Sequence, residues 1–172
     1  AKVIAVDTNK FRLDQSRDFG ATETLEVSSG QDIAAALREL SPDGLGVDVA
    51  IEAVGLPATF GTALESVRPG GHVANVGVHG HPATLHLEKL WIRDVTIMTG
   101  LVDTFSTPRL LELISNGRLD ATPFATHRFP LGETMAAYDT FAAAAETNAL
   151  KVVLEAEPAV PEVAERERAA VA

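Results

Sequence analysis

Short runs with strand character that alternate with helical segments constrain the fold of this chain more than any other feature. These runs occupy residues 1–7, 22–27, 47–53, 72–76, 95–98, 124–129 and 151–154. Several are continuous apolar stretches, which are typical of strands buried on both faces, and no hairpin signal joins two of them. Strands that alternate with helices pair in parallel through right-handed crossovers. The sequence therefore predicts an α/β fold with a doubly wound parallel sheet.

Capping residues and turns predict where the helices begin and end. Gly20 is expected to stop a helix over residues 10–19, because glycine adopts a left-handed backbone at little cost. Ser29 and Asp32 have capping-box spacing before a helix that ends near residue 40, and Pro57 suits a first helical position. Residues 68–71 (Arg-Pro-Gly-Gly) predict a tight turn into the strand at 72–76.

The pattern changes from residue 124 onward. A strand at 124–129 precedes a helix over 133–144, in which Met135 and Tyr138 are expected to face inward. A last strand follows at 151–154. Beyond residue 155 the chain has prolines, alternating charges and no apolar stripe, which predicts a disordered tail.

Composition excludes several classes of function. With 172 residues the chain is long enough for one domain with a core. A net charge of −10 disfavours a nucleic-acid partner, and no apolar run approaches the length of about 18 residues that spans a membrane. There is no cysteine, so disulfides, thiolate nucleophiles and cysteine-based zinc sites are excluded for these residues. No secretion signal is visible, so we expect a cytoplasmic location.

The ends of the predicted strands carry the candidate binding residues. Ligands of a doubly wound sheet lie in the crevice beyond the carboxyl ends of its strands. Those ends are Asp7, then Ala53, Val54 and Gly55, then Val76, Gly77 and Val78, and finally Thr99, Gly100 and Leu101. Three of the four contain glycine, which lets a ring or a sugar approach the backbone closely.

Asp7 closes the first apolar run and could accept hydrogen bonds from the ribose of a nucleotide. Such an acid normally follows a G-x-G-x-x-G loop by about 20 residues. Only six residues precede Asp7, and the chain contains no such loop. We therefore interpret this run as the second strand of a nucleotide-binding unit whose first strand and phosphate loop are missing. A turn or capping role for Asp7 is the alternative.

Other polar residues have weaker claims to a function. His79, His81 and His86 form a sparse cluster, but a metal site on this glycine-rich loop is not favoured. Glu52 lies near a strand end and could act as a general base, although a hydrogen-bonded structural role is the preferred interpretation. Lys151 could reach a pyrophosphate, with an exposed surface position as the alternative.

Seven segments in a fixed order carry a resemblance to a known family. They are residues 5–7 (AVD), 19–22 (FGAT), 46–55 (GVDVAIEAVG), 68–73 (RPGGHV), 75–78 (NVGV), 126–129 (THRF) and 150–154 (LKVVL). Together they resemble the medium-chain, zinc-dependent alcohol dehydrogenases, most of all the bacterial branch. The resemblance implies that residues 1–120 are a truncated, Rossmann-like NAD-binding domain and that residues 121–154 return to an absent catalytic domain. Residues 155–172 would be the tail.

The same resemblance implies roles for individual residues. Asp7 would bind the adenosine ribose and favour NAD over NADP, with Arg12 beside the same ribose. The other roles follow the strand ends: Ala53, Val54 and Gly55 on the adenosine side, Val76, Gly77 and Val78 near the nicotinamide, Thr99, Gly100 and Leu101 at its amide and ribose, and Lys151 on the pyrophosphate.

The chain also departs from the family pattern, because it lacks the phosphate loop, the zinc ligands and the proton relay. We therefore expect it to be inactive alone and to belong to a larger NAD- and zinc-dependent enzyme that acts on an alcohol, aldehyde or ketone. That enzyme would be a homodimer or homotetramer, paired through the strand at residues 95–101. The absent first strand would also leave the strands at 1–6 and 47–53 with open edges.

Three alternatives stay open. The first is a zinc-free quinone or enoyl reductase of the same superfamily. The second is a SAM-dependent methyltransferase, which also has an acid after its second strand and a turn that resembles residues 68–71. The third is a nucleotide-binding fragment without catalytic activity.

Overall fold

The computed structural model describes residues 1–100 and 104–156. The predicted site residue Leu101 and nearly all of the predicted tail therefore lie outside the described residues. The chain divides into two compact units. One unit combines Ala1–Glu26 with the described part of the chain from Arg109 on, and the other is Val27–Pro108.

The first unit begins with a strand–helix–strand segment. Its elements are β1 (Ile4–Asp7), α1 (Lys10–Asp18) and β2 (Glu23–Glu26). The strands pair in parallel, with Asp7 opposite Glu26. Asn9 caps α1, because its Oδ1 accepts a hydrogen bond from the Arg12 backbone N–H at 3.1 Å. Gly20 follows the helix with φ = 101°, which confirms the predicted helix end.

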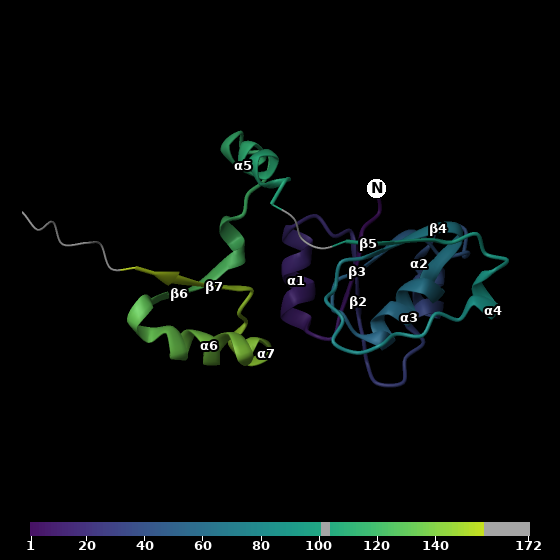
Figure 1. The fold of residues 1–172 in the computed structure, drawn as a ribbon, viewed down its shortest axis with the longest axis horizontal. Helices are drawn as coiled ribbons and strands as arrows, with labels where there is room; N and C mark the ends of the chain where they lie inside the picture. Colours follow the sequence, from purple (N-terminus) through teal and green to yellow (C-terminus); the bar gives the residue numbers. More distant parts are fainter. Residues whose placement is uncertain (101–103, 157–172) are drawn as a thin grey trace, which may run out of the picture. The chain divides into compact units, whose positions relative to one another are not determined.

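The same unit contains a second parallel strand pair, which α6 covers (Figure 1). The elements in this part of the chain are α5 (Thr107–Ser115), the 3₁₀ helices η1 (Thr122–Phe124) and η2 (Leu131–Glu133), β6 (Ala125–Pro130), α6 (Thr134–Ala142), α7 (Ala144–Thr147) and β7 (Lys151–Glu155). The helix predicted over 133–144 is therefore two helices. Ala137, Ala144 and Ala149 are buried. Met135 and Tyr138 are exposed, so the prediction that they face inward is wrong. The buried positions in this region are occupied by these small alanines instead.

The second unit has a three-stranded parallel sheet with the order β3-β4-β5 (Figure 1). Its elements are α2 (Ile33–Leu40), β3 (Val47–Glu52), α3 (Pro57–Ser66), β4 (Val67–Asn75), α4 (Leu87–Leu90) and β5 (Thr96–Thr99). Helix α3 packs against β3, β4 and α2. The core of this unit consists of Ala63, Leu64, Val67 and Val73, so one face of α3 and the centre of β4 exclude water together.

Two local predictions for this unit need correction. Residues 68–71 lie within β4 instead of forming a turn before it. Pairing shifts register between Val47 opposite Val67 and Val49 opposite His72, so the glycine pair widens the strand locally and does not end it. The helix cap is also different, because Asp32 and not Ser29 accepts the Ala35 backbone N–H, at 2.8 Å.

Every strand pair among the described residues is parallel, which confirms the α/β prediction. Within those residues β1 pairs only with β2, and β3 pairs only with β4. Each of these strands therefore has one edge without a partner strand, as expected for a sheet that lacks its first strand. Open edges of this kind favour pairing with another strand.

Candidate functional site

One buried residue, Glu52, links the carboxyl ends of β3 and β4. Glu52 is the last residue of β3 and is only 3% exposed. Its Oε1 accepts hydrogen bonds from the backbone N–H of Val54 at 2.9 Å, the backbone N–H of Gly55 at 2.8 Å and the hydroxyl of Thr59 at 2.7 Å. The carboxylate therefore holds the turn after β3 against the first turn of α3.

The main chain of Glu52 holds the turn after β4 in the same way. Its carbonyl oxygen accepts the backbone N–H of Val76 at 2.8 Å and the backbone N–H of Gly77 at 3.1 Å. Glu52 thus accepts hydrogen bonds from both turns at this edge of the sheet. The structure confirms the hydrogen-bonded structural role preferred for this residue.

Two glycines are required because the turns touch each other. A Cβ atom on Gly55 would lie within 3.0 Å of the Val78 backbone, and the φ of Gly55 is +86°. A Cβ atom on Gly77 would lie equally close to Glu52 Oε2 and to the backbone of Gly55. The predicted site residues Gly55 and Gly77 are therefore brought together, and only glycine fits at either position.

A histidine and an asparagine complete the polar cluster around Glu52. His79 Nε2 lies 2.9 Å from Asn75 Oδ1 and 3.5 Å from Glu52 Oε2. The Asn75 amide donates to the Gly77 carbonyl oxygen at 3.2 Å, and the imidazole ring packs edge-on against Phe60. Two buried atoms, Glu52 Oε2 and His79 Nδ1, have no hydrogen-bond partner among the residues that the structure describes.

The outer surface of the same edge is apolar. Val54 is 63% exposed and Val78 is 83% exposed, and Val76 is also exposed. Ala53, Thr99 and Gly100 are exposed as well, and Thr99 is opposite Asn75 in the β4–β5 pair. The site thus combines exposed apolar side chains with two turns whose backbone is hydrogen-bonded to Glu52. This combination suits a flat ring and an attached amide or sugar.

The pKa of Glu52 depends on opposing effects. Burial raises it, but hydrogen bonds from Thr59, Gly55 and Val54, together with nearby His79, outweigh burial, and the pKa lies below its ordinary value.

We expect this carboxylate to contribute to the pH dependence of folding. Because its pKa is lower in the folded than in the unfolded state, where it is about 4.3, its ionised form stabilises the fold above that pH. The contribution is lost as the pH falls through the folded pKa. Urea unfolding between pH 3 and 7 should therefore show a steeper acid loss for wild type than for Glu52→Gln. The exposed Glu39→Gln controls for net charge, and parallel curves for wild type and Glu52→Gln would contradict the prediction.

Three other predicted site residues belong to the first unit. Asp7 Oδ1 accepts the Asn9 backbone N–H at 2.8 Å, and Asp7 Oδ2 lies 4.0 Å from the Arg12 guanidinium. One Asp7 oxygen therefore makes a turn contact, and the second oxygen is directed toward Arg12. Lys151 is exposed at the start of β7, opposite Ala125 of β6.

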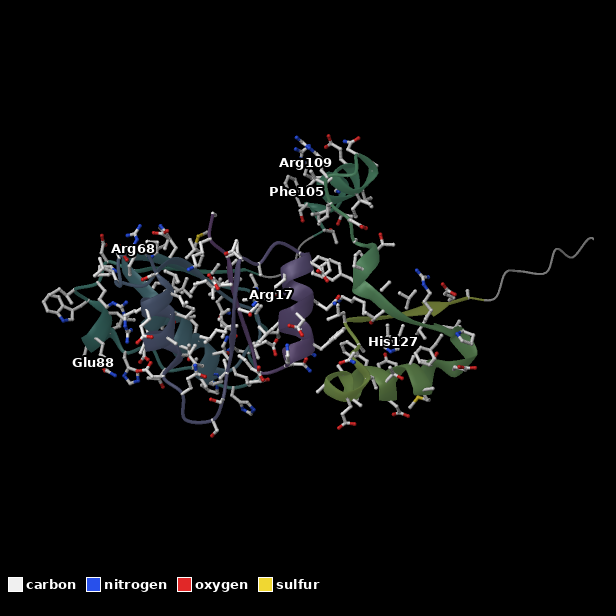
Figure 2. The ribbon with its side chains drawn as sticks, turned by 180° about the vertical axis from the view of Figure 1, so that it is seen from behind. Arg17, Arg68, Glu88, Phe105, Arg109 and His127 are labelled. Carbon is white, nitrogen blue, oxygen red and sulfur yellow. The ribbon has the colours of Figure 1, made fainter. Side chains whose placement is uncertain are left out.

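The remaining polar pairs lie elsewhere. His86 Nδ1 lies 2.7 Å from an oxygen of Glu88 on α4, whereas His79 belongs to the cluster around Glu52. Arg68, which is labelled in Figure 2, pairs with Asp48 at 2.6 Å. Asp48 lies near the start of β3, whereas Glu52 is its last residue. Among residues 1–100 and 104–156, no three His, Asp or Glu side chains are grouped as a metal ion requires.

Sequence reasoning missed Thr59, Asn75 and the position of His79. Asn75 was a visible signal, because it is a polar residue at the end of an otherwise apolar strand. Thr59 gave no such signal, since a threonine in a first helical turn is ordinary. Proximity in sequence groups His79 with His81 and His86, whereas the contacts of His79 in the fold come from β3, β4 and α3.

The chain is similar to known dehydrogenases in sequence and in fold. Residues 1–116 match the family described as zinc-binding dehydrogenase. An alcohol dehydrogenase of Cupriavidus necator is 35% identical over 81% of this chain and 39% of its own length. An L-idonate 5-dehydrogenase of Vitis vinifera is 31% identical over 88% of this chain and 42% of its own length. The solved structure of zinc-dependent alcohol dehydrogenase 2 from Streptococcus pneumoniae superimposes with a TM-score of 0.86 at 41% identity, covering 92% of this chain and 46% of that one.

The chain therefore belongs to the zinc-binding dehydrogenase family of oxidoreductases, and its fold is the Rossmann-like cofactor-binding fold of that family. It spans about two fifths of the length of the curated relatives. This assignment favours a dehydrogenase over the methyltransferase alternative. In the described part of the chain, none of the helices is both long and apolar enough to cross a membrane.

Proposed function

We propose that this chain is the cofactor-binding part of an NAD-dependent, zinc-dependent alcohol dehydrogenase. The observation that carries the proposal is the Asp7 carboxylate at the carboxyl end of β1, with one oxygen fixed by the Asn9 N–H. A carboxylate in this position can accept hydrogen bonds from two ribose hydroxyls, and it repels the 2′-phosphate that distinguishes NADP. Arg12 at 4.0 Å is the residue that could favour NADP, but it already faces Asp7.

The chain's own residues would bind and orient the cofactor. The nicotinamide supplies a hydride acceptor when the cofactor is bound. Gly55, Gly77 and Gly100 allow close approach to the backbone, Val54 and Val78 offer apolar contact, and Lys151 would neutralise pyrophosphate charge. Leu101 is proposed for the same site by resemblance alone.

Zinc does not fit the residues present. The sequence has no cysteine, and the described residues contain no group of three metal-binding side chains. We therefore place the zinc ligands in the catalytic domain of a larger protein and expect this chain to be inactive alone. Residues 1–120 would be its cofactor domain and residues 121–154 the segment that returns to the catalytic domain.

The assembly and location of the protein are also proposals. The open edge of β5 supports pairing of two copies in a homodimer or homotetramer, because an unpaired edge strand can add a strand from a partner. The acidic net charge of −10 supports a small-molecule substrate over nucleic acid, and we expect a cytoplasmic enzyme without membrane association.

The experiment uses the full-length protein that contains this chain. NADH and NADPH are titrated separately by fluorescence, and oxidation of primary and secondary alcohols is followed with and without a zinc chelator. We expect tighter binding of NADH than NADPH and loss of alcohol oxidation on chelation. Cofactor binding with quinone or enoyl reduction that resists chelation would favour the zinc-free reductase, and absence of binding to either nucleotide would overturn the proposal.

A further inference from the structure

Glu52 is a buried charge whose hydrogen bonds all go to segments that border the proposed cofactor site. Its side chain is 1% exposed, and the ionisable side chain beside it in the described part of the chain is His79, whose Nε2 lies 3.5 Å from Glu52 Oε2. Removing a carboxylate from water is costly, and an apolar residue of similar volume often fills such a place with equal or greater stability. We therefore infer that the carboxylate has a function that an apolar residue could not perform, such as accepting the hydrogen bonds of the turn.

We propose that Glu52 is a positioning residue for the nicotinamide cofactor, acting through the turns Val54–Gly55 and Val76–Val78. The inference rests on the proposed function, since it assigns these turns to the cofactor site. Glu52 does not itself contact the cofactor. It holds both turns in the conformation that the cofactor meets, so that binding does not require them to be ordered.

The five hydrogen bonds to Glu52 show how this works. Three donors on Oε1 fix the turn after β3 to Thr59 at the start of α3. Two donors on the main-chain carbonyl oxygen fix the turn after β4. Without the carboxylate, the N–H groups of Val54 and Gly55 would lose their acceptor, which for a buried donor is unfavourable enough to move the turn.

Contact between the turns couples them to the same carboxylate. Gly77 lies directly against Glu52 Oε2 and the backbone of Gly55, and Gly55 lies against the Val78 backbone. A shift of the first turn therefore displaces the second. Val54 on the first turn and Val78 on the second are exposed apolar residues of the site, so their spacing depends on Glu52.

Four substitutions in the full-length protein test the proposal. Glu52→Ala removes the acceptor, and Glu52→Gln retains one oxygen at the Oε1 position. Thr59→Val removes one donor without changing the shape of the side chain. Asp48→Ala is the matched control on the same strand, because Asp48 pairs with Arg68 at the other end of β3. NADH affinity, the KM for NAD and kcat are measured at a temperature where each variant is folded by circular dichroism.

We expect Glu52→Ala to weaken NADH binding about tenfold and Thr59→Val about threefold, with a raised KM for NAD and little change in kcat. Glu52→Gln should retain affinity within about threefold, and Asp48→Ala should match wild type. A folded Glu52→Ala that binds NADH like wild type would overturn the inference. A Glu52→Gln as weak as Glu52→Ala would also overturn it, because the retained acceptor would then not be what holds the turns.

The same measurements separate this inference from the proposed function. If wild type binds neither NADH nor NADPH, the proposed function has failed. If wild type binds NADH and Glu52→Ala is folded but unaffected, only the positioning role has failed. If Glu52→Ala does not fold, Thr59→Val decides, and an unchanged NADH affinity in that variant would reject the role.

Discussion

Replacing Gly77 by alanine is expected to lower the free energy of unfolding of the full-length protein by about 3 kcal/mol or more. The added Cβ would lie within 3.0 Å of Glu52 Oε2 and of the Gly55 backbone, and neither can move freely. Glu52 is fixed by five hydrogen bonds, and Gly55 is held by the same carboxylate. Relief of the overlap therefore requires separation of the two turns. Urea unfolding, with amide hydrogen exchange of β4 as a local readout, measures the effect.

Gly61→Ala is the matched control for this substitution. Gly61 lies in α3, and no atom beyond its own helix backbone lies within 4 Å of the position of an added Cβ. Alanine is favoured over glycine in a helix by about 1 kcal/mol, so this variant should be more stable than wild type. A loss of less than about 1 kcal/mol for Gly77→Ala would show that the turns are not in the close contact seen here.

Replacing Asp7 by alanine is expected to weaken NADH binding to the full-length protein by about 10- to 100-fold. Hydrogen bonds from hydroxyls to a carboxylate are charge-assisted, and two of them to the ribose account for an effect of this size. NADPH should lose less or gain, because removal of the carboxylate also removes its repulsion of the 2′-phosphate and leaves Arg12 without its acidic neighbour. Fluorescence titrations with both nucleotides measure the change in their ratio.

Two further variants identify the cause. Asp7→Asn retains an oxygen that can accept the Asn9 N–H, so it preserves the turn while removing the charge. Asp14→Asn removes one negative charge from the exposed side of α1, where Asp14 pairs with Lys10, and should leave both affinities unchanged. An Asp7→Ala protein with an unaltered preference between NADH and NADPH would contradict the assignment of Asp7 to the ribose.

Local rules predicted the elements well where the relevant contacts are close in sequence. Pro57 begins α3 as expected, and Gly20 follows α1 with a positive φ. The same local rules were wrong where contacts with a segment distant in sequence determine the structure. Residues 68–71 are predicted to form a turn, but the flanking residues Val67 and His72 both pair with β3, so the segment lies within β4 as an irregularity. Helical spacing predicts that Met135 and Tyr138 face inward. Spacing alone does not indicate which face of the helix the β6–β7 pair covers, and both side chains are exposed.

The alternation of strands and helices along the chain, the parallel pairing that this alternation implies and the glycine-bearing strand ends were determined by the sequence alone, because apolar periodicity and turn residues act within a few positions. Only the tertiary structure decided that Glu52, Thr59, Asn75 and His79 form one cluster. Their side chains come from β3, α3, β4 and the loop after β4, and no local pattern requires them to meet. Parallel strands bring their carboxyl ends to one edge of the sheet. At that edge the buried Glu52 carboxylate accepts hydrogen bonds from the turn after β3 and from Thr59, and it lies 3.5 Å from His79.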